Sequence, residues 1–581
     1  MYVRKFLYLF SIIAEWYNVR HFVWIILKMA KTKLSDTQIA QALENSVEEE
    51  EEFVLPDFSS DSEPEYVFSA SEIEDEFSDD GAENIEDATE NMAIYKGKDG
   101  TIWSKSPPPT SKIRSSNKIK GKVDKVLLPP GKTLENILDC FRLFISNEVC
   151  AQIIQYTNQE AERVYANQSI KWRALDNDEL LSFFGELLSI FKASMSSRRF
   201  GELLRFIRFD DKLTRSSRRL GDTLAPIRNI WDMVNHNLGK YYMPSEYLVV
   251  DEQLMPCRSR CCFIQYLPSK PDKYGIQIWW LCDSKNAYPL RGIPYTGKEG
   301  NTRSVGLAKN VVERLCEPYY GTNRNITMDN YFTSKELAEN LLGKGLTIVG
   351  TLRKNKACIP PEFLPNRKRA VSSTIFGFQK NITIASHVPK VGKAVIFLST
   401  MHHTCNILKN GETNISEINM FYNETKGGVD TFDQLVHEYM TKRKTNRWPL
   451  AFFMNMLDAA GIAAYIIWTK QNSLWNSGKS NRRHLFLREL CEQLVVPMIL
   501  KRQKKPHMRM ETQSAISDIL QIRNDVLPVS SNDNNNKRKR CYICPSKKAR
   551  MQKQCCKICN KNVCNEHSQT TKICQNCENN K

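Results

Sequence analysis

The chain has 581 residues, with 82 Lys and Arg against 65 Asp and Glu, and a formal net charge of +17. This length predicts several structural units at roughly 100–200 residues per domain. A hydrophobic content of 41% excludes a wholly disordered chain, and the scarcity of glycine (25 residues) and the lack of heptad runs exclude collagen-like and coiled-coil classes.

The amino-terminal part, residues 1–129, is predicted to be disordered. Residues 1–28 contain an apolar run, Phe6–Ala14, that is too short to span a bilayer, and no signal cleavage site follows. We expect this segment to be an upstream extension, with a short amphipathic or transit-like segment as the alternative. The tract 44–90 holds 20 Asp and Glu and no Lys or Arg, which leaves +37 on the rest of the chain. That charge suggests a polyanionic partner, most simply nucleic acid. No membrane partner is expected, because the apolar runs of the chain are too short to span a bilayer.

A helical region is predicted over residues 130–246, because apolar residues recur there at helical spacing. From Tyr247 to residue 355, short β-rich runs alternate with helical stretches, which indicates an α/β layer. The predicted strands are Tyr247–Val250, Ile276–Cys282, Asn325–Met328 and Leu346–Val349, and the predicted helices are Val305–Leu315 and Ser334–Leu342.

The chain beyond residue 355 is predicted to hold three further parts. Residues 356–416 are expected to form an irregular or β-rich insertion, and a helix is expected in 417–439. Residues 440–530 are again helical, and the almost wholly apolar Ala451–Trp468 is interpreted as a buried core helix, since a membrane span needs a longer clean run. A basic linker, 531–540, precedes a Cys-rich end.

Four acids lie at the starts and ends of these predicted elements. Asp251 follows the first strand, Asp329 ends the third, and Asp430 opens a helix after a Gly-Gly turn. Asp433 lies three residues further on, on the same helical face. Carboxylates at strand ends suit a hard divalent cation such as Mg²⁺, but an isolated Asp there is ordinarily a turn former or helix cap. Composition alone does not join them into one site.

The carboxyl-terminal cysteines form a metal-binding pattern. Four ligand pairs are present, which are Cys541 and Cys544, Cys556 and Cys559, Cys564 and His567, and Cys574 and Cys577. Eight ligands fill two tetrahedral Zn²⁺ sites, and a cross-braced order joins the first pair with the third (Cys₃His) and the second with the fourth (Cys₄). Cys555 is left over and could replace Cys556. The basic run 537–540 and the lysines that follow predict DNA contact, a nuclear localisation signal, or both.

The sequence resembles the piggyBac family of transposases in several long blocks that occur in order. The blocks are Val249–Pro256, Pro268–Gly275, Asn325–Ser334, Leu346–Thr351, Tyr422–Asp430 and Lys444–Pro449. With the Cys-rich end, the resemblance covers roughly residues 130–577. It implies a ribonuclease-H-like catalytic domain with a β-rich insertion, a flanking helical DNA-binding and dimerisation region, and a cross-brace zinc domain (541–577).

The resemblance also implies the site and the reaction. The family's DDD triad matches Asp251, Asp329 and Asp430, and Asp433 matches a further acid of the motif. These carboxylates are expected to hold two Mg²⁺ (or Mn²⁺) ions, with Asp433 in support. The implied activity is DNA nicking, hairpin formation on the transposon end and strand transfer to TTAA sites. The implied partners are double-stranded DNA with terminal inverted repeats and a second copy of the chain as a homodimer, in the nucleus, and the zinc domain is expected to bind the repeat.

A basic block after the third acid is predicted to contact DNA. Its residues are Lys442, Arg443, Lys444, Arg447 and Trp448. The cations can neutralise phosphates, and the tryptophan can stack on an unpaired base. The alternative is a solvated basic turn with Trp448 in the core.

The sequence departs from the family between Gly185 and Ser196, where family members carry a segment longer by roughly twenty residues, about a helix and a turn. This keeps a second hypothesis open, a domesticated DNA-binding protein without excision activity. A third is a RING- or PHD-like zinc protein that acts as a ubiquitin ligase or chromatin reader. The intact acids favour the transposase, and the basic residues around the Cys-rich end favour DNA over a ligase.

Overall fold

The computed structural model describes residues 94–109, 115–166, 168, 170–185, 191–268, 270–297, 306–410, 413–505, 508–524, 539–545, 548, 551–552 and 562–567. The segment 1–28, the acidic tract 44–90 and most of the predicted linker 531–540 lie outside these residues.

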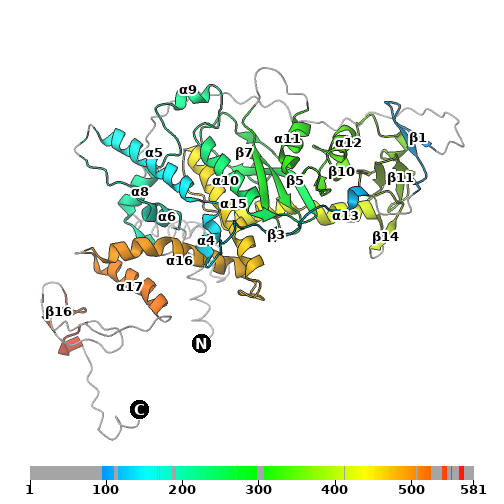
Figure 1. Ribbon diagram of the computed structural model, residues 1–581. Coiled ribbons are helices and arrows are strands. Elements are labelled where there is room, and N and C mark those ends of the chain that lie inside the picture. The colour runs from blue at the N-terminus through cyan, green and yellow to red at the C-terminus, as the bar shows by residue number, and fades with distance from the viewer. Residues whose placement is uncertain are drawn as a thin grey trace, which may run out of the picture.

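A mixed sheet flanked by helices forms the middle of the molecule (Figure 1). Its central strands are β5 (Tyr247–Pro256), β7 (Tyr274–Asp283), β8 (Pro289–Pro294), β9 (Asn325–Met328) and β10 (Thr347–Leu352). They lie in the order β8-β7-β5-β9-β10, with β5, β9 and β10 parallel and β7 antiparallel to both of its neighbours. The four predicted strands are therefore confirmed, as are the helices between them, α11 (Leu307–Cys316) and α12 (Lys335–Gly343).

The central strands are apolar because both faces of the sheet are covered. All four residues of β9 are buried, as expected of a parallel strand with helices on either side. Strand β5 is longer than predicted, because its antiparallel pairing with β7 continues to Pro256 after its pairing with β9 has ended.

The residues predicted to form an insertion extend this same sheet. Strands β11 (Thr374–Phe378), β12 (Thr383–His387) and β13 (Val395–Ser399) are joined by antiparallel pairs, and β13 pairs with β10. A separate hairpin, β14 (Ile407–Asn410) and β15 (Thr413–Ser416), leads into α13 (Glu417–Thr425).

The prediction that residues 1–129 are disordered is wrong for their described part. Strands β1 (Ile94–Lys96) and β2 (Ile102–Ser104) form a hairpin on β11, and the fully buried Trp103 donates from Nε1 to the Cys358 carbonyl at 2.8 Å. Further on, the buried Arg324 guanidinium donates to the Lys122 carbonyl at 2.8 Å. The basic, proline-containing composition of this segment gives no sign of these few buried contacts.

Helices precede and follow the strands of the sheet in the sequence. Before it lie α4 (Ile137–Arg142), α5 (Asn147–Tyr165), α6 (Asn177–Phe184), α7 (Phe191–Ser194), α8 (Ser197–Phe206), α9 (Arg215–Arg219) and α10 (Arg228–Lys240). After it lie α14 (Gly428–Glu438), α15 (Trp448–Gln471), α16 (Arg482–Gln503) and α17 (Met510–Asn524). Short paired strands are β3 (Lys125–Val126) with β4 (Tyr242–Met243), β6 (Gln265–Tyr266) with β7, and β16 (Lys539–Arg540) with β17 (Met551–Gln552).

Helix α15 is the core helix of the fold. It packs against α4, α10 and α14, and most of its residues are buried. Among the described residues it is the one helix long and apolar enough to cross a membrane. Its burial inside the protein confirms the prediction of a buried core helix over Ala451–Trp468.

Candidate active site and metal centre

Asp251 and Asp329 lie side by side on neighbouring parallel strands. The last paired residues of β5 and β9 are Val250 and Met328, so the next residue on each strand is one of the two acids. Asp251 was predicted to follow its strand, but it lies in the middle of β5, opposite Trp280 of β7. It stands where the parallel pairing ends, and this places it beside Asp329.

The two residues are half-buried, and their carboxyl groups interact electrostatically. Burial raises the pKa of Asp251 to about 9, and the neighbouring charges of Glu252 and Asp329 add to this effect. Burial also raises the pKa of Asp329, although the Tyr331 N–H donates to its carboxylate at 2.9 Å and opposes the rise. Two adjacent acids in a site of low polarity favour their neutral forms unless a cation is present.

The turn after β9 fixes the direction of Asp329. The hydroxyl of Thr333 donates to the Asp329 carbonyl at 2.6 Å and closes this turn. On the adjacent strand β10, a side chain at Gly350 would meet the Thr333 hydroxyl at 2.3 Å. Because residue 350 is glycine, no side chain intrudes on the space that this turn occupies.

Asp430 reaches the site because α14 begins against the sheet. A Cβ atom at Gly428 would meet the Val249 side chain at 2.4 Å and the Asp283 carbonyl at 3.2 Å. Only glycine allows the first turn of the helix to come this close to β5. Asp430 lies exposed in that turn, one residue beyond the buried Val429.

Tyr422 of α13 lies within electrostatic range of all three acids. Burial raises the pKa of its hydroxyl, a hydrogen bond with Thr351 opposes the rise, and the charges of Asp329, Asp251 and Asp430 add to it. The structure thus brings together the three acids that sequence composition could not join. Among the described residues, none of the three forms an ion pair with Lys or Arg.

Asp433 is bound by protein side chains instead. Gln253 donates to its carboxylate at 2.9 Å, and His437, one helical turn further on, lies 3.4 Å away through Nδ1. The Gln253 amide oxygen in turn accepts from Trp280 Nε1 at 2.9 Å. The hydrogen bond to Asp433 raises the pKa of His437 to about 9, and its Nε2 lies 3.2 Å from Asp272.

Sequence reasoning missed Gln253, His437 and Tyr422. Gln253 lies two residues after Asp251 and so shares its face of the strand, and His437 lies four after Asp433 on one helix face. Those spacings could have identified the first two. Tyr422 comes from a different helix, and its place as the first residue of the block Tyr422–Asp430 could have identified it.

The site fits a divalent cation by its donor set. Three carboxylates that form no ion pair with the described Lys and Arg side chains offer hard oxygen ligands, which Mg²⁺ and Mn²⁺ prefer. A cation would offset the burial and the like-charge repulsion that together raise the pKa of Asp251.

The basic block divides into residues that face solvent and residues that hold the fold. Lys442 and Lys444 are exposed. Arg447 donates to the Leu204 and Arg205 carbonyls at 3.0 and 3.3 Å, where it caps the end of α8. Trp448 is 4% exposed and packs edge to face on Phe263, so the prediction that it offers a face to a base is wrong. Its alternative, a core position, is what the structure has.

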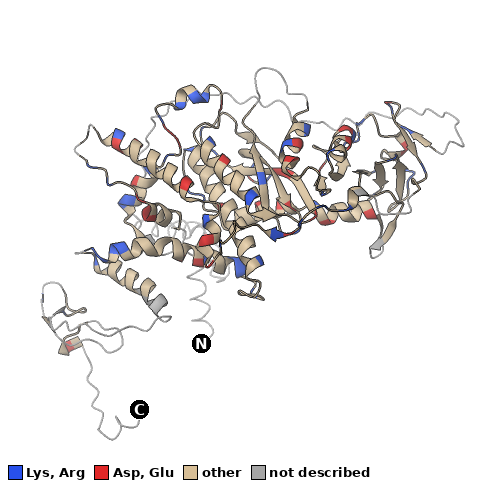
Figure 2. Ribbon diagram, viewed as in Figure 1, with Lys and Arg blue, Asp and Glu red and all other residues tan. Residues whose placement is uncertain are grey.

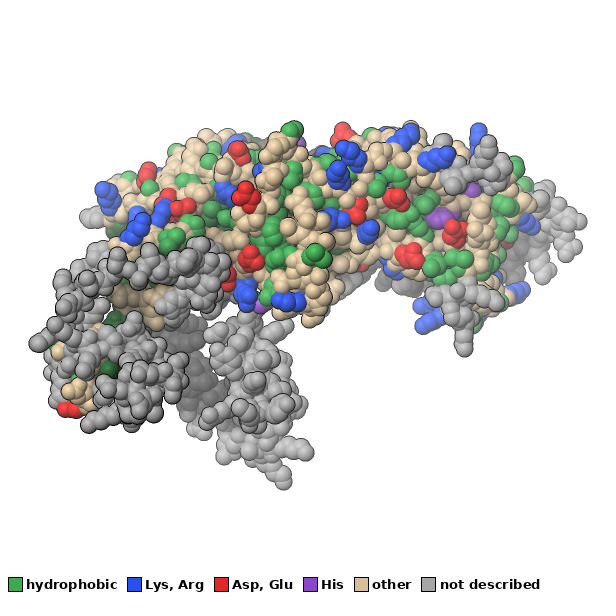
Figure 3. Space-filling view, turned by 60° about the horizontal axis from the view of Figure 1, so that its bottom comes forward, with side chains coloured by type: hydrophobic (Ala, Val, Ile, Leu, Met, Phe, Trp, Pro, Cys, Tyr) green, Lys and Arg blue, Asp and Glu red, His purple; other side chains and the backbone are tan. Residues whose placement is uncertain are grey.

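Charge alone does not mark a DNA surface on the described part of the chain. Lys and Arg are spread over many elements, α9 and the end of α16 among them (Figure 2). On the face turned forward in Figure 3, basic side chains are interspersed with acidic ones. Arg443 makes a contact within the protein, because its guanidinium lies 4.9 Å from the Phe200 ring centre.

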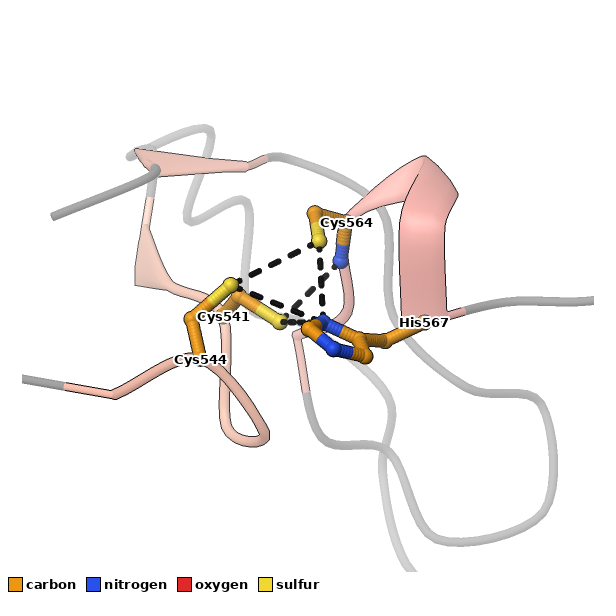
Figure 4. Close-up of side chains that lie close together, drawn as sticks. All are labelled: Cys541, Cys544, Cys564 and His567. Carbon is orange, nitrogen blue, oxygen red and sulfur yellow. Dashed lines mark hydrogen bonds between the residues drawn. The ribbon is translucent and has the colours of Figure 1, made fainter. Parts of the chain in front are cut away.

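The Cys₃His group is assembled as predicted from the first and third ligand pairs. The ligand atoms of Cys541, Cys544, Cys564 and His567 all lie within 4.8 Å of one another (Figure 4). The ring atom that faces the sulfurs is Nδ1, at 3.3 Å from Cys564 Sγ and 3.5 Å from Cys544 Sγ. Three thiols and one imidazole at these distances match a structural Zn²⁺ site.

Backbone N–H groups lower the pKa of one of these thiols. Removal from water raises the pKa of Cys541, but the N–H groups of Cys564, Ile543 and Cys544 outweigh this and bring it to about 6. The Cys564 N–H lies 3.2 Å from the Cys541 sulfur. The other predicted ligands, Cys556, Cys559, Cys574 and Cys577, lie outside the described residues, as does Cys555.

Three comparisons find similar proteins. Residues 186–465 match a family described as Transposase IS4. The chain is 23% identical over 404 residues to PiggyBac transposable element-derived protein 3 of Homo sapiens, covering 60% of this chain and 67% of that protein. The Chimeric ERCC6-PGBD3 protein of Homo sapiens matches equally, but the chain spans only 37% of its length. The cryo-EM structure of a piggyBac transposase synaptic complex with hairpin DNA matches at a TM-score of 0.67 and 36% identity, covering 77% of this chain and 98% of that one.

Proposed function

The chain belongs to the piggyBac transposase family, and on this premise we propose that it is a metal-dependent, cut-and-paste DNA transposase. It nicks DNA at the transposon ends, forms a hairpin there and joins the freed 3′-hydroxyl to TTAA targets. The similar solved structure is a synaptic complex with hairpin DNA, which supports this reaction for the present chain.

The catalytic domain is proposed to be ribonuclease-H-like. The strand order β8-β7-β5-β9-β10, with β7 antiparallel and the others parallel, supports this assignment. In such a sheet the acids belong on the middle strand, on its parallel neighbour and on a following helix. Asp251 lies on β5, Asp329 directly follows β9 and Asp430 lies in the first turn of α14, which supports this assignment.

Each acid has a proposed role that follows from its surroundings. Asp251, Asp329 and Asp430 would hold two Mg²⁺ or Mn²⁺ ions, which when bound supply charge neutralisation at the scissile phosphate and activation of the attacking hydroxyl. The sheet register and the close contact at Gly428 fix these carboxylates before DNA arrives. Asp433 fastens α14 to β5 through Gln253, and it orients His437 of the same helix, whose Nε2 lies 3.2 Å from Asp272.

The remaining partners are assigned on family grounds. The zinc domain binds the terminal inverted repeat, and two copies of the chain act together as a homodimer in the nucleus. Lys442 and Lys444, which are exposed beside the catalytic helix, contact phosphates of the bound duplex.

The observation that carries the proposal is the placement of the acids: Asp251 and Asp329 directly follow the parallel pairing of β5 and β9, and Asp430 lies in the first turn of α14, which packs closely on β5 at Gly428. The test is cleavage of TTAA-flanked transposon-end DNA in Mg²⁺, with binding followed separately by gel shift. Asp329→Asn and Asp329→Ala should each abolish cutting, a loss on the order of 10³-fold or more, and spare binding. Glu339→Gln, an exposed acid on α12, is the control and should cut normally.

Two outcomes would contradict the assignment. If Asp329→Ala cuts normally, the carboxylates are not the catalytic group. If the intact protein binds transposon-end DNA but never cuts it, also after a helical segment is restored between Gly185 and Ser196, the chain is a domesticated DNA-binding protein.

A further inference from the structure

A single carboxylate lies inside the core helix α15. Asp458 is 9% exposed, and the residues on either side of it along the helix, Leu457 and Ala459, are buried and apolar. Moving a carboxylate out of water is costly unless other groups compensate. An acid at this position therefore needs an explanation in terms of what it binds.

Asp458 binds the start of the loop that follows α14. Its Oδ1 accepts the backbone N–H of Thr441 at 2.9 Å. The Thr441 hydroxyl donates to the Met454 carbonyl of α15 at 3.0 Å. Both the main chain and the side chain of Thr441 are thus fastened to the core helix.

Arg483 of α16 holds the chain just before this point. Its guanidinium donates to the Leu435 carbonyl at the end of α14 and to the Glu438 carboxylate at 3.2 Å, and it lies 4.9 Å from the Tyr439 ring centre. The positive charge of Arg483 also acts on Asp458 and favours the ionised carboxyl. The acid and the guanidinium thereby secure the chain from the end of α14 to Thr441.

The loop itself, residues 440–447, has no helix or strand to give it shape. It is fastened at Thr441, at Thr445, whose carbonyl accepts from Ser259 at 3.1 Å, and at Arg447 on the end of α8. Lys442 and Lys444 are exposed between these anchors. Their direction is set by the anchors, because the loop has no other regular support.

We propose that Asp458 and Arg483 form a clamp that positions the loop 440–447 for contact with the DNA backbone. The inference rests on the proposed DNA-binding function. Asp458 and Arg483 are positioning residues, since they act through Thr441 and the end of α14 and face the protein interior.

The test compares three single variants in the full-length protein. Asp458→Asn keeps an oxygen acceptor for the Thr441 N–H, and Asp458→Leu removes it. The apolar cavity beside Asp458, lined by Gly461, Ile462 and Leu487, gives the leucine room. Ile466→Ala, a buried apolar residue further along α15, is the matched control for loss of stability without loss of an anchor.

The readout is binding to a random-sequence DNA duplex over a range of salt concentrations. Loss of the anchor in Asp458→Leu should lower affinity three- to tenfold and flatten the salt dependence by roughly one to two units of slope, at about 0.9 per lost phosphate contact. Asp458→Asn and Ile466→Ala should keep the wild-type slope. Amide exchange in a peptide covering 440–447 should speed up in Asp458→Leu alone.

Several results would overturn the clamp. A wild-type slope in Asp458→Leu would do so, as would equal flattening in Ile466→Ala. If Asp458→Leu does not fold, Arg483→Met replaces it, because it leaves Asp458 in place and removes the bonds to Leu435 and Glu438. A wild-type slope in Arg483→Met is then decisive against the proposal. Failure of the wild-type protein to bind any duplex refutes the proposed function instead, and amide protection at 440–447 still tests the clamp.

Discussion

The carboxylate site and the zinc centre differ in what holds their ligands. Asp251 and Asp329 are placed by the register of two paired strands, and Asp430 by the contact of Gly428 with Val249. At the zinc centre the described surroundings are two short strands, and the apolar side chains Tyr542, Ile543 and Met551 are 55%, 53% and 52% exposed. The carboxylate ligands are therefore placed by the packing of the fold before a metal binds. The described part of the zinc centre has no apolar core that could place its ligands without metal.

Metal removal should have the largest effect, because it should unfold the zinc centre and leave the carboxylate site folded. A structural zinc ion contributes roughly 10–16 kcal/mol to the folding of a small module. We expect a strong chelator, or Cys541→Ser, to abolish amide protection in residues 539–567 while residues 247–352 stay protected. The full-length protein should carry two zinc ions per chain before treatment. Protection that survives chelation would show that the module has a core of its own.

A buried acid with only protein partners gives the next test. Burial raises the pKa of Asp458 to about 7, against an ordinary value of 3.8, although the Thr441 N–H and Arg483 oppose the rise. Because its folded pKa is raised, its favourable contribution is complete below about pH 4 and is lost as pH rises to about 7. Asp458→Asn removes this loss.

Asp458→Asn should therefore stabilise the protein at high pH. At about 1.4 kcal/mol per pKa unit, the gain in free energy of unfolding at pH 8 is up to about 4 kcal/mol, and it shrinks toward pH 5. Chemical denaturation at the two pH values measures it. Leu457→Met, an apolar exchange at the neighbouring buried position, is the control and should show no such pH dependence. A gain that is equal at pH 5 and pH 8 would show that the charge of Asp458 is not costly.

The sequence predicted those parts that depend on local pattern. Alternating apolar runs identified β5, β7, β9 and β10, and ligand spacing identified the Cys₃His group. Both signals follow from chemistry within a few residues. The joining of Asp251, Asp329 and Asp430 came from family resemblance, because only tertiary structure brings them together.

The rest depended on long-range contacts that leave little trace in the sequence. Trp448 follows four cations within six residues of the sequence, yet it is buried in the core against Phe263. The amino-terminal hairpin has a composition typical of linkers, and the buried Trp103 anchors it. The length of β5 was underestimated because its pairing with β7 extends beyond its apolar run.

Gly428→Ala tests whether packing positions the carboxylates. The added methyl group would meet Val249 at 2.4 Å, and such overpacking costs about 1–3 kcal/mol. The beginning of α14 should move away from β5, so that cleavage falls by at least tenfold while DNA binding is kept. Val249→Ala in the same chain should restore part of the cleavage. Full activity in Gly428→Ala would mean that the metals, rather than the fold, place Asp430.

The smallest expected effect is on stability, and it distinguishes basic residues that contact DNA from those that stabilise the fold. Lys442→Ala with Lys444→Ala should leave stability within about 0.5 kcal/mol of wild type, because both side chains are exposed. The salt dependence of DNA binding should flatten by about two units, close to 0.9 per phosphate contact. Arg447→Ala should do the reverse, because its guanidinium binds carbonyls at the end of α8, and the loss should be about 1–3 kcal/mol of stability with little change in slope. Titration of a duplex against salt, beside chemical denaturation, measures both quantities, and an unchanged slope in the lysine variant would make the loop a solvated turn.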